Sequence, residues 1–147
     1  MVQATWTAEH VIRYRETDGV DGHIWNGFDG KGTFPCLLLT TLGRKSNTLR
    51  TTPLIYGNDG RSYIVIASQG GLPTHPHWYE NLTLAPEVEI QVKAEKYRAQ
   101  AGTIGGERRN VLWEMMVEIY PPYRVYQEKA TPAREIPVVE LVPIGKK

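Results

Sequence analysis

The chain has 147 residues, of which 41% are hydrophobic and 22% are charged, enough for one domain with a single core. The formal net charge of +1 excludes the broad basic field of a typical nucleic-acid-binding domain, so nucleic acid is not expected as a partner. The single cysteine, Cys36, excludes an internal disulfide and a zinc site built from several cysteines.

The N-terminal segment, residues 1–32, is expected to form a partly irregular arm ahead of the main domain, residues 33–147. Its glycine-rich stretch is typical of a loop, with Trp25 and Phe28 either as anchors onto the body or as part of a flap over a site. The arm lacks the apolar core of a signal peptide, and no apolar run is long enough to span a membrane, so a cytoplasmic location is expected. Its small apolar face leaves open only a weak peripheral contact with the inner face of the membrane.

Short apolar segments after the arm predict strands. A buried strand is expected after Pro35, in CLLLTTL, because turn residues flank this short apolar run. A hairpin is expected where LRTTPLIY and RSYIVIAS flank GNDG, because Asn and Gly tolerate positive φ. Three further strands are expected in VEIQV, KYRAQAGTI and IPVVELVPI.

Helices are expected in three places. One begins near Pro76 and ends before Pro86. A second is amphipathic, with Leu112 and Met116 facing inward, and a short third is expected in PPYRVYQEKA. About six antiparallel strands with a few helices predict a mainly β, α+β fold, a closed or half-open barrel with flanking helices.

Common catalytic motifs are absent from the sequence. GxGxxG, GxxxxGK[ST] and GxSxG do not occur, and no carboxylate pair suggests an acid and a base. His75 and His77 flank a proline without a third ligand nearby, so no metal is expected. Cys36 lies in an apolar context and is expected to be a buried small hydrophobe. Such a chain suits chemistry that is carried by a cofactor.

The GRKSN turn is a candidate anion site. Arg44 and Lys45 stand on the turn and Arg50 begins the next strand, so a strand–turn–strand connection can bring three cations together. Guanidinium groups bind phosphate or carboxylate bidentately, lysine adds a point charge, and Ser46 adds a hydroxyl. A solvated turn is the alternative that the residues leave open.

Two other motifs could face a planar ligand. Backbone N–H groups of SQGG, with Ser68 and Gln69, could pair with the edge of a heterocycle, unless the glycines serve only the turn. Trp78 could pack against a ring, with Asn81 on roughly the same helical face, although a residue such as Trp78 is commonly part of the core.

In this order, the segments TTLGRKSNTLRTTPLIY, YIVIASQGG, HPHWYENL and YPPYRVY resemble the deazaflavin-dependent nitroreductase family, the split β-barrel oxidoreductases that use coenzyme F420. The resemblance covers roughly residues 33–142 and does not extend to the arm. It implies a split β-barrel of antiparallel strands with helices beside it, and a binding site for coenzyme F420.

The resemblance also implies the site residues. The turn and the downstream arginine would hold the phosphate and the acidic oligoglutamate tail of the cofactor, and the strand end before GG would face the deazaflavin ring. Ile55 and His77 depart from residues that members often carry, so the substrate preference of the best-known members does not carry over. The implied cofactor-binding residues are Arg44, Lys45, Ser46, Arg50, Thr51, Thr52, Pro53, Leu54, Ile66, Ala67, Ser68, Gln69, His77, Trp78, Tyr79 and Asn81. The residues that would border the substrate are Ile55, Tyr120, Tyr123 and Tyr126.

The expected function is hydride transfer from reduced coenzyme F420 to a lipophilic acceptor: a quinone, an activated alkene or a nitroaromatic. Ser68 or Tyr120 would donate a hydrogen bond to charge developing on the acceptor, and Tyr123 or solvent would supply the proton. Two alternatives stay open, a reductase that binds FMN in the same barrel and a non-catalytic carrier of the deazaflavin or of a lipophile. A homodimer is also open, because split barrels often dimerise.

Overall fold

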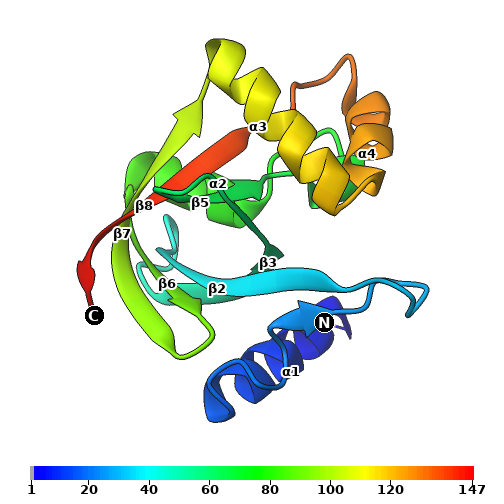
Figure 1. Cartoon of the computed structure of the whole chain (residues 1–147). Helices are drawn as coiled ribbons and strands as arrows, with labels where there is room; N and C mark the ends of the chain where they lie inside the picture. The colour runs from blue at the N-terminus through cyan, green and yellow to red at the C-terminus, as the bar shows by residue number, and fades with distance from the viewer. Residues whose placement is uncertain (1) are drawn as a thin grey trace.

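The computed structural model, which describes residues 2–147 and side chains from Trp6 onward, shows an antiparallel sheet curled into a half-barrel with four flanking α-helices (Figure 1). Met1 lies outside the described residues. The predicted split β-barrel is confirmed. The strands are β1 Ile24–Trp25, β2 Phe34–Leu42, β3 Leu49–Ile55, β4 Gly57–Asn58, β5 Tyr63–Ile66, β6 Glu87–Val92, β7 Glu95–Ile104 and β8 Val138–Lys146. The helices are α1 Val2–Glu16, α2 His77–Leu84, α3 Gly106–Ile119 and α4 Pro122–Ala130, with a short 3₁₀ turn η1 at Gln69–Gly71.

The sheet is organised around β2. The strand order is β1-β2-β6-β7-β8-β5-β4, and β3 pairs with β2 outside this path. β2 and β3 form a hairpin across the GRKSN turn, with Leu42 opposite Leu49 and Cys36 opposite Ile55. In Figure 1, α3 and α4 lie above the sheet and α1 lies below β2, which leaves the curled sheet between them.

The hairpin predicted around GNDG differs from the observed one. Leu49–Ile55 pairs with β2 rather than with β5, and only Gly57 and Asn58 pair back onto β5. β3 pairs with β2 over seven residues, whereas β5 pairs with β8 along its whole length. The local sequence pattern fits a turn at either GRKSN or GNDG, and the longer partner strand decides the pairing.

The core has two parts, which alternate strand residues fill. On β5, Ile64 and Ile66 pack toward α3 and α4, whereas Val65 faces the interior of the barrel. Val138 and Val139 on β8 divide in the same way. Both β5 and β8 therefore contribute to the two halves of the core.

Cys36 is buried, as predicted, with 3% of its surface exposed. Burial raises the pKa of its thiol to about 12. The side chain is therefore a neutral thiol at physiological pH, in keeping with a small hydrophobe.

The N-terminal arm contains a helix that the sequence did not predict. Residues 1–33 show no clear apolar periodicity, yet Val2–Glu16 is helical. The segment contains no Gly or Pro, and Arg13 and Arg15 in its last turn suit a helix C-terminus. The helix is followed by left-handed backbone at Asp18, with φ 51°, and Gly19, with φ 82°.

Tyr14 attaches α1 to the barrel. The side chain is fully buried, and its hydroxyl lies 3.0 Å from the carbonyl oxygen of Cys36 and accepts from the N–H of Lys93 at 2.8 Å. Trp25 packs on Phe34, as expected for an anchor, whereas Phe28 is 83% exposed. The domain boundary at residue 32 stays a prediction. None of the helices described has the length and apolar character that crossing a bilayer requires.

Candidate active site

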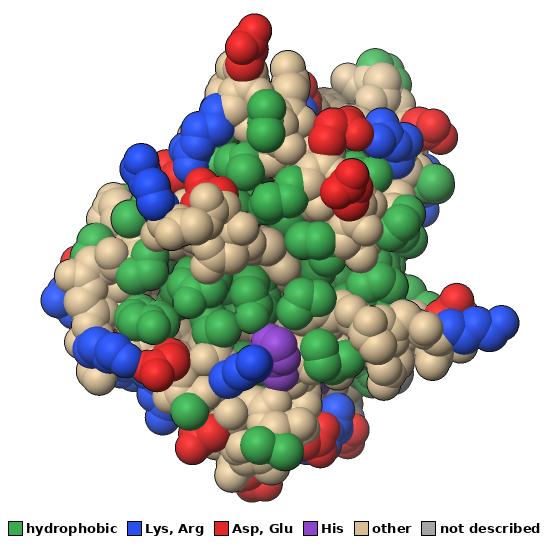
Figure 2. Space-filling view, viewed as in Figure 1, with side chains coloured by type: hydrophobic (Ala, Val, Ile, Leu, Met, Phe, Trp, Pro, Cys, Tyr) green, Lys and Arg blue, Asp and Glu red, His purple; other side chains and the backbone are tan. Residues whose placement is uncertain are grey.

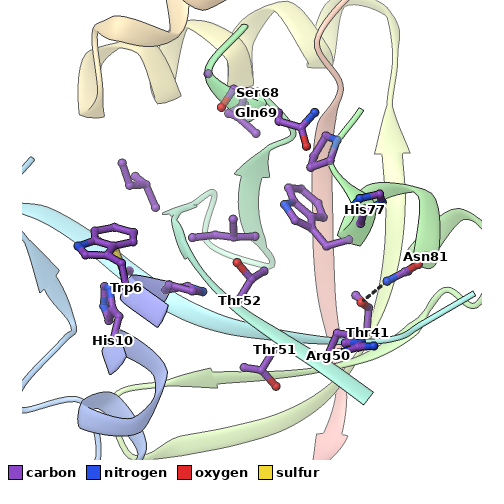
Figure 3. A pocket seen from close by; sticks show the side chains of 18 of the residues that line it. Trp6, His10, Thr41, Arg50, Thr51, Thr52, Ser68, Gln69, His77 and Asn81 are labelled. Atoms are coloured by element: carbon purple, nitrogen blue, oxygen red, sulfur yellow. Dashed lines mark hydrogen bonds between the residues drawn. The ribbon is translucent and has the colours of Figure 1, made fainter. Parts of the chain in front are cut away.

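A pocket of about 820 Å³ opens between α1, β3, α2 and the loop after β5. Figure 2 shows hydrophobic side chains gathered in a recess at the centre of one face, with basic side chains and a histidine near its lower edge. Figure 3 shows Trp6 and His10 on one side of the pocket, His77 and Asn81 on the other, and Ser68 and Gln69 above Thr52. The predicted site residues that line it are Arg44, Lys45, Ser46, Arg50, Thr51, Thr52, Pro53, Leu54, Ile55, Ile66, Ser68, Gln69, His77, Trp78, Asn81, Tyr120, Tyr123 and Tyr126.

Ala67 and Tyr79 are the predicted cofactor residues that do not line this pocket. Ala67 is fully buried, because it continues the strand alternation one residue beyond β5. The hydroxyl of Tyr79 is directed to Thr103 on β7, 2.8 Å from its Oγ1. Neither side chain is therefore placed to contact a ligand in the pocket.

The GRKSN turn closes the β2–β3 hairpin and presents its cations at the pocket. The N–H of Gly43 donates to the carbonyl of Thr48 at 2.8 Å, and Asn47 takes the left-handed conformation, with φ 57°. The Ser46 hydroxyl lies 2.8 Å from Thr48 Oγ1, so it already has a partner within the turn. Because strand pairing fixes both ends of the turn, its residues have a defined position at the mouth of the pocket.

The three cations of this region are not equivalent. The Arg44 guanidinium binds α2, where it contacts Glu80 Oε1 at 2.9 Å, Asn81 Oδ1 at 3.0 Å and His77 Nδ1 at 3.3 Å. Lys45 and Arg50 are exposed, and neither forms an ion pair within the described part of the chain. They are therefore the cations better placed to receive an anionic ligand.

The SQGG segment forms a tight turn with an unusual backbone. Gln69, Gly70 and Gly71 have φ of 45°, 62° and 85°. A Cβ at Gly71 would lie 2.7 Å from the carbonyl oxygen of Tyr126, so glycine permits close packing of this turn on α4. The Gln69 amide donates to the carbonyl oxygen of Thr74 at 3.0 Å, whereas the Ser68 side chain does not cap the turn. Ser68 is thus the residue of this turn whose side chain is available to a ligand.

Asn81 on α2 connects the helix to β2 and to the GRKSN turn. It is 4% exposed; its amide donates to Thr41 Oγ1 at 3.1 Å, and its Oδ1 accepts from both the backbone N–H and the guanidinium of Arg44. Trp78, one helical turn earlier, is partly buried against the barrel core and also lines the pocket. Both residues therefore line the pocket and also hold α2 against the barrel.

Three tyrosines form an aromatic wall where α3 meets α4. The Tyr120 and Tyr126 hydroxyls are 3.0 Å apart, and the ring centroids of Tyr120 and Tyr123 are 4.9 Å apart. Burial raises the pKa of Tyr120 and that of Tyr123 above the ordinary tyrosine value. Both phenols are therefore neutral donors at physiological pH.

The sequence interpretation left open that Trp25 and Phe28 of the arm lie over a site, but it missed the contribution of α1 to the pocket. Trp6 and His10 line it from α1, four residues apart and so on one helical face. Trp25 and Phe28 line it as well, with centroids 4.9 Å apart in an edge-to-face arrangement. The Trp–His spacing is the one sequence signal of this face, because the segment shows no apolar periodicity. Other lining residues that were not predicted are Cys36, Thr41, Gly43, Gly70 and Pro76.

Comparison with known proteins identifies the family. The sequence profile described as F420H(2)-dependent quinone reductase matches residues 6–143. The chain belongs to the F420H(2)-dependent quinone reductase family. An F420H(2)-dependent quinone reductase of Mycobacterium tuberculosis is 38% identical over 135 residues, which are 90% of this chain and 86% of the relative.

Two solved structures agree with this assignment. An F420-H2 dependent reductase, FDR-A, is 39% identical, covers 73% of this chain and 93% of its own, and superposes with a TM-score of 0.66. A structure described as a domain-swapped dimer is 35% identical, covers 95% of this chain and 98% of its own, and has a TM-score of 0.69. The predicted oxidoreductase class and coenzyme F420 as the cofactor are thus confirmed, and FMN gains no support. The family match begins within α1, so it includes most of the arm that the sequence resemblance left out.

Proposed function

We propose that this F420H(2)-dependent quinone reductase reduces lipophilic quinones, and that its pocket holds the anionic handle of the cofactor at the β2–β3 hairpin and the acceptor beside the arm. One observation carries the proposal: a single pocket joins the cations Lys45 and Arg50 to an aromatic end formed by Trp6, Trp25 and Tyr120. The two ends match the two chemistries that reaction requires, an anion and a flat apolar molecule.

The residues present fit coenzyme F420. Lys45 and Arg50 would hold the phosphate and the acidic tail through charged hydrogen bonds, with Thr51 and Thr52 lining the adjacent groove. Trp78 and Ile66 line the same pocket and would offer an apolar surface to the planar ring. When bound in its reduced form, the deazaflavin supplies a hydride.

The roles of the chain in the reaction are to orient, to exclude water and to stabilise charge. The Ser68 and Tyr120 hydroxyls are candidate donors to negative charge that develops on a quinone oxygen. Solvent or Tyr123 would supply the proton, and solvent is the better source because burial raises the pKa of the Tyr123 phenol and makes it a weaker acid. The aromatic side chains of the arm restrict water at the acceptor end, which strengthens each of these hydrogen bonds.

A quinone is favoured over other acceptors by the acceptor end of the pocket. Trp25 and Tyr120 line this end with ring centroids 6.0 Å apart, and Phe34, which does not itself line the pocket, packs against Tyr120 with centroids 4.9 Å apart. Such a surface suits a flat bicyclic ring with a lipophilic chain. Activated alkenes and nitroaromatics remain secondary substrates to be compared in the same assay.

We also propose a homodimer and an intracellular site of action. The relative described as a domain-swapped dimer covers nearly the whole chain and supports self-association. The peripheral membrane contact stays a prediction, since its surface rests on scattered exposed side chains such as Trp6 and Val20. Analytical ultracentrifugation would test the homodimer, and vesicle flotation would test the membrane contact.

An anaerobic assay tests the proposed function. Purified protein is mixed with reduced coenzyme F420 and 2-methyl-1,4-naphthoquinone, and the return of the oxidised cofactor absorbance is followed; parallel reactions contain FMN with NADPH, an enone or a nitroaromatic. Quinone-dependent oxidation faster than with the other acceptors is expected. Tight cofactor binding without turnover of any acceptor would instead identify a carrier, and turnover only with FMN would overturn the cofactor assignment.

A further inference from the structure

Arg134, which does not line the main pocket, binds the backbone of the loop that contains Ser68–Leu72. Arg134 Nη1 donates to the carbonyl oxygen of Ala67 at 2.9 Å, Nη2 to that of Ser68 at 2.7 Å, and Nε to that of Leu72 at 2.9 Å. One guanidinium thus binds three main-chain oxygens of one short loop. No sequence motif singled out this residue.

His75 completes the arrangement. Its Nδ1 lies 3.1 Å from Arg134 Nη1, and because a guanidinium can only donate, this nitrogen accepts and the imidazole proton lies on Nε2. The fork of Arg134 is therefore engaged on both of its arms and at Nε. A side chain with this many partners has little freedom to reorient.

The loop needs such a support because its backbone is strained. Gln69 is a non-glycine residue at φ 45°, and it is followed by Gly70 and Gly71, which also have positive φ. Residues in sparsely populated backbone regions persist only where the surroundings fix them, and they cluster at binding sites. The three carbonyl contacts of Arg134 provide that fixation.

The direction of the carbonyls determines what the loop presents to the pocket. In a trans peptide the C=O and the following N–H point in opposite directions. The carbonyls of Ala67 and Ser68 face Arg134, which lines a separate hollow of about 480 Å³ beside α3 and α4. The N–H groups of Ser68 and Gln69 therefore point away from Arg134, toward the side on which both residues line the main pocket.

From this geometry we propose that Arg134 is a positioning residue: it orients the 67–68 and 68–69 peptides so that the two N–H groups donate to an electron-rich edge of the planar ring of the cofactor. The inference rests on the proposed function for the identity of that ring. Arg134 does not touch the ligand, and its effect reaches the ring through the loop. It is expected to act on the ring and not on the phosphate or the acidic tail, which lie at the β2–β3 hairpin.

A pair of variants separates positioning from general stability. Arg134→Lys keeps the charge but lacks the planar fork, so it cannot reach three carbonyls and His75 together. Arg109→Lys is the matched control, because Arg109 is also partly buried, donates to one carbonyl oxygen, that of Ile136 at 2.7 Å, and stacks over Trp113 in the same hollow. Arg109 makes no contact with the loop among the described hydrogen bonds.

Two ligands locate the effect: oxidised coenzyme F420, and its deazariboflavin analogue, which lacks the phosphate and the glutamate tail. Fluorescence titration well below the melting temperature of each variant gives the dissociation constants. Arg134→Lys is expected to weaken both ligands by the same factor, about 3- to 10-fold for loss of one hydrogen bond, while Arg109→Lys leaves both unchanged. Unchanged affinities in Arg134→Lys, a loss confined to full-length F420, or an equal loss in Arg109→Lys would each overturn the proposal.

Hydrogen exchange of the ligand-free proteins distinguishes a failure of the positioning role of Arg134 from a failure of the proposed function. Peptides that cover residues 67–72 are expected to exchange about tenfold faster in Arg134→Lys than in wild type or Arg109→Lys. Exchange that does not differ overturns the positioning role even if F420 binds. A wild-type protein that binds neither ligand overturns the proposed function even if the exchange result holds, and with it the assignment of the ring.

Discussion

The Arg44 guanidinium lies 2.9 Å from the Glu80 carboxylate on α2, and the same side chain donates to Asn81 at 3.0 Å. The sequence grouped Arg44 with Lys45 and Arg50 as one anion site. Because Glu80 already occupies the guanidinium, an anionic ligand would have to displace a carboxylate to reach it. Arg44 therefore ties the turn to the helix, while Lys45 and Arg50 carry the free positive charge.

Replacing Arg44 should affect stability first. Arg44→Ala removes one of the two donors to Asn81 Oδ1, the guanidinium, and leaves this buried amide oxygen with the backbone N–H of residue 44 alone. The free energy of unfolding should fall by about 1–3 kcal/mol, the range for a lost charged hydrogen bond at a partly buried site. Urea denaturation measures it, with Lys45→Ala as the exposed control, expected to change by no more than about 0.5 kcal/mol. An equal loss of unfolding free energy in the two variants would contradict the role of Arg44 in holding the turn against α2.

Replacing Arg50 should affect the cofactor. Arg50→Ala removes a charged hydrogen bond to phosphate or carboxylate and should weaken coenzyme F420 by about 1.5–3 kcal/mol, or about 10–150-fold. The wild-type affinity should fall with added salt, and this salt dependence should be smaller in the variant. The analogue that lacks both the phosphate and the acidic tail is the control ligand and should bind both proteins alike. Unchanged F420 affinity in both Arg50→Ala and Lys45→Ala would contradict the proposed anion site.

Much of the barrel could be predicted because its signals are local. The alternation in Glu87–Val92 and the proline-bounded segment that became α2 are readable from neighbouring residues. The partner of β3 was predicted wrongly, because a turn is possible on either side of β3 and the length of the register with each neighbouring strand decides the pairing. Whether Arg44 is free or paired could not be read either, since Glu80 lies 36 positions away.

The arm shows a different limit. Helix α1 has no clear apolar stripe, because it buries few side chains, chiefly Val11 and Tyr14 against Leu38. Its attachment relies on hydrogen bonds of Tyr14 to residues far along the chain, which no local pattern reveals. Arg134 was missed for the same reason, because the three carbonyl groups that it binds lie more than sixty positions before it. Resemblance to the family supplied the cofactor, whereas these contacts could come only from the fold.

Tyr14→Phe should destabilise the protein through a single lost hydroxyl. The Lys93 N–H would lose its acceptor at 2.8 Å and the Cys36 carbonyl its nearby donor, within a fully buried site. The unfolding free energy should fall by about 1–3 kcal/mol, the cost of leaving a buried polar group unpaired. Denaturation together with limited proteolysis of α1 measures the effect. Tyr97→Phe, at a half-buried position on β7, is the control, and an equal loss there would argue against a special role for Tyr14.

Stability should decrease in mild acid. The pKa of His75 is lowered by burial and by the neighbouring Arg134, and the pKa of His23 is lowered by burial and by Lys93. Because the unfolded chain titrates near 6.5, it binds more protons than the folded chain between the lowered values and 6.5, so the unfolding free energy falls as the pH drops through this window. Above it the stabilisation is fully present.

The measurement is a set of urea denaturation curves from about pH 8 to about pH 5. The double variant His23→Asn, His75→Asn should show a flatter profile, because it lacks both groups. A wild-type profile as flat as that of the double variant would exclude these histidines as the source.

The Tyr120–Tyr126 pair gives the sharpest test of the chemistry. Tyr120 packs against Phe34 and Trp25 at the acceptor end, and its hydroxyl is 3.0 Å from that of Tyr126. If Tyr120 donates to the developing oxyanion, Tyr120→Phe should lower kcat by about 100-fold, as for loss of one preorganised donor, with cofactor affinity unchanged. Tyr126→Phe removes only the partner that orients this hydroxyl, so about a 3- to 10-fold loss is expected.

The pH profile adds a second criterion to the tyrosine test. Burial raises the pKa of the Tyr120 phenol, so Tyr120 stays protonated through the range in which an ordinary tyrosine ionises near 10. The wild-type rate should therefore not fall near pH 10 through ionisation of Tyr120. Any fall near that pH should be the same in wild type and in Tyr120→Phe. Single-turnover kinetics of the two tyrosine variants and of Ser68→Ala decide between the donors. A larger loss in Ser68→Ala than in Tyr120→Phe would assign the oxyanion contact to Ser68, because the remaining tyrosine would then be insufficient without it.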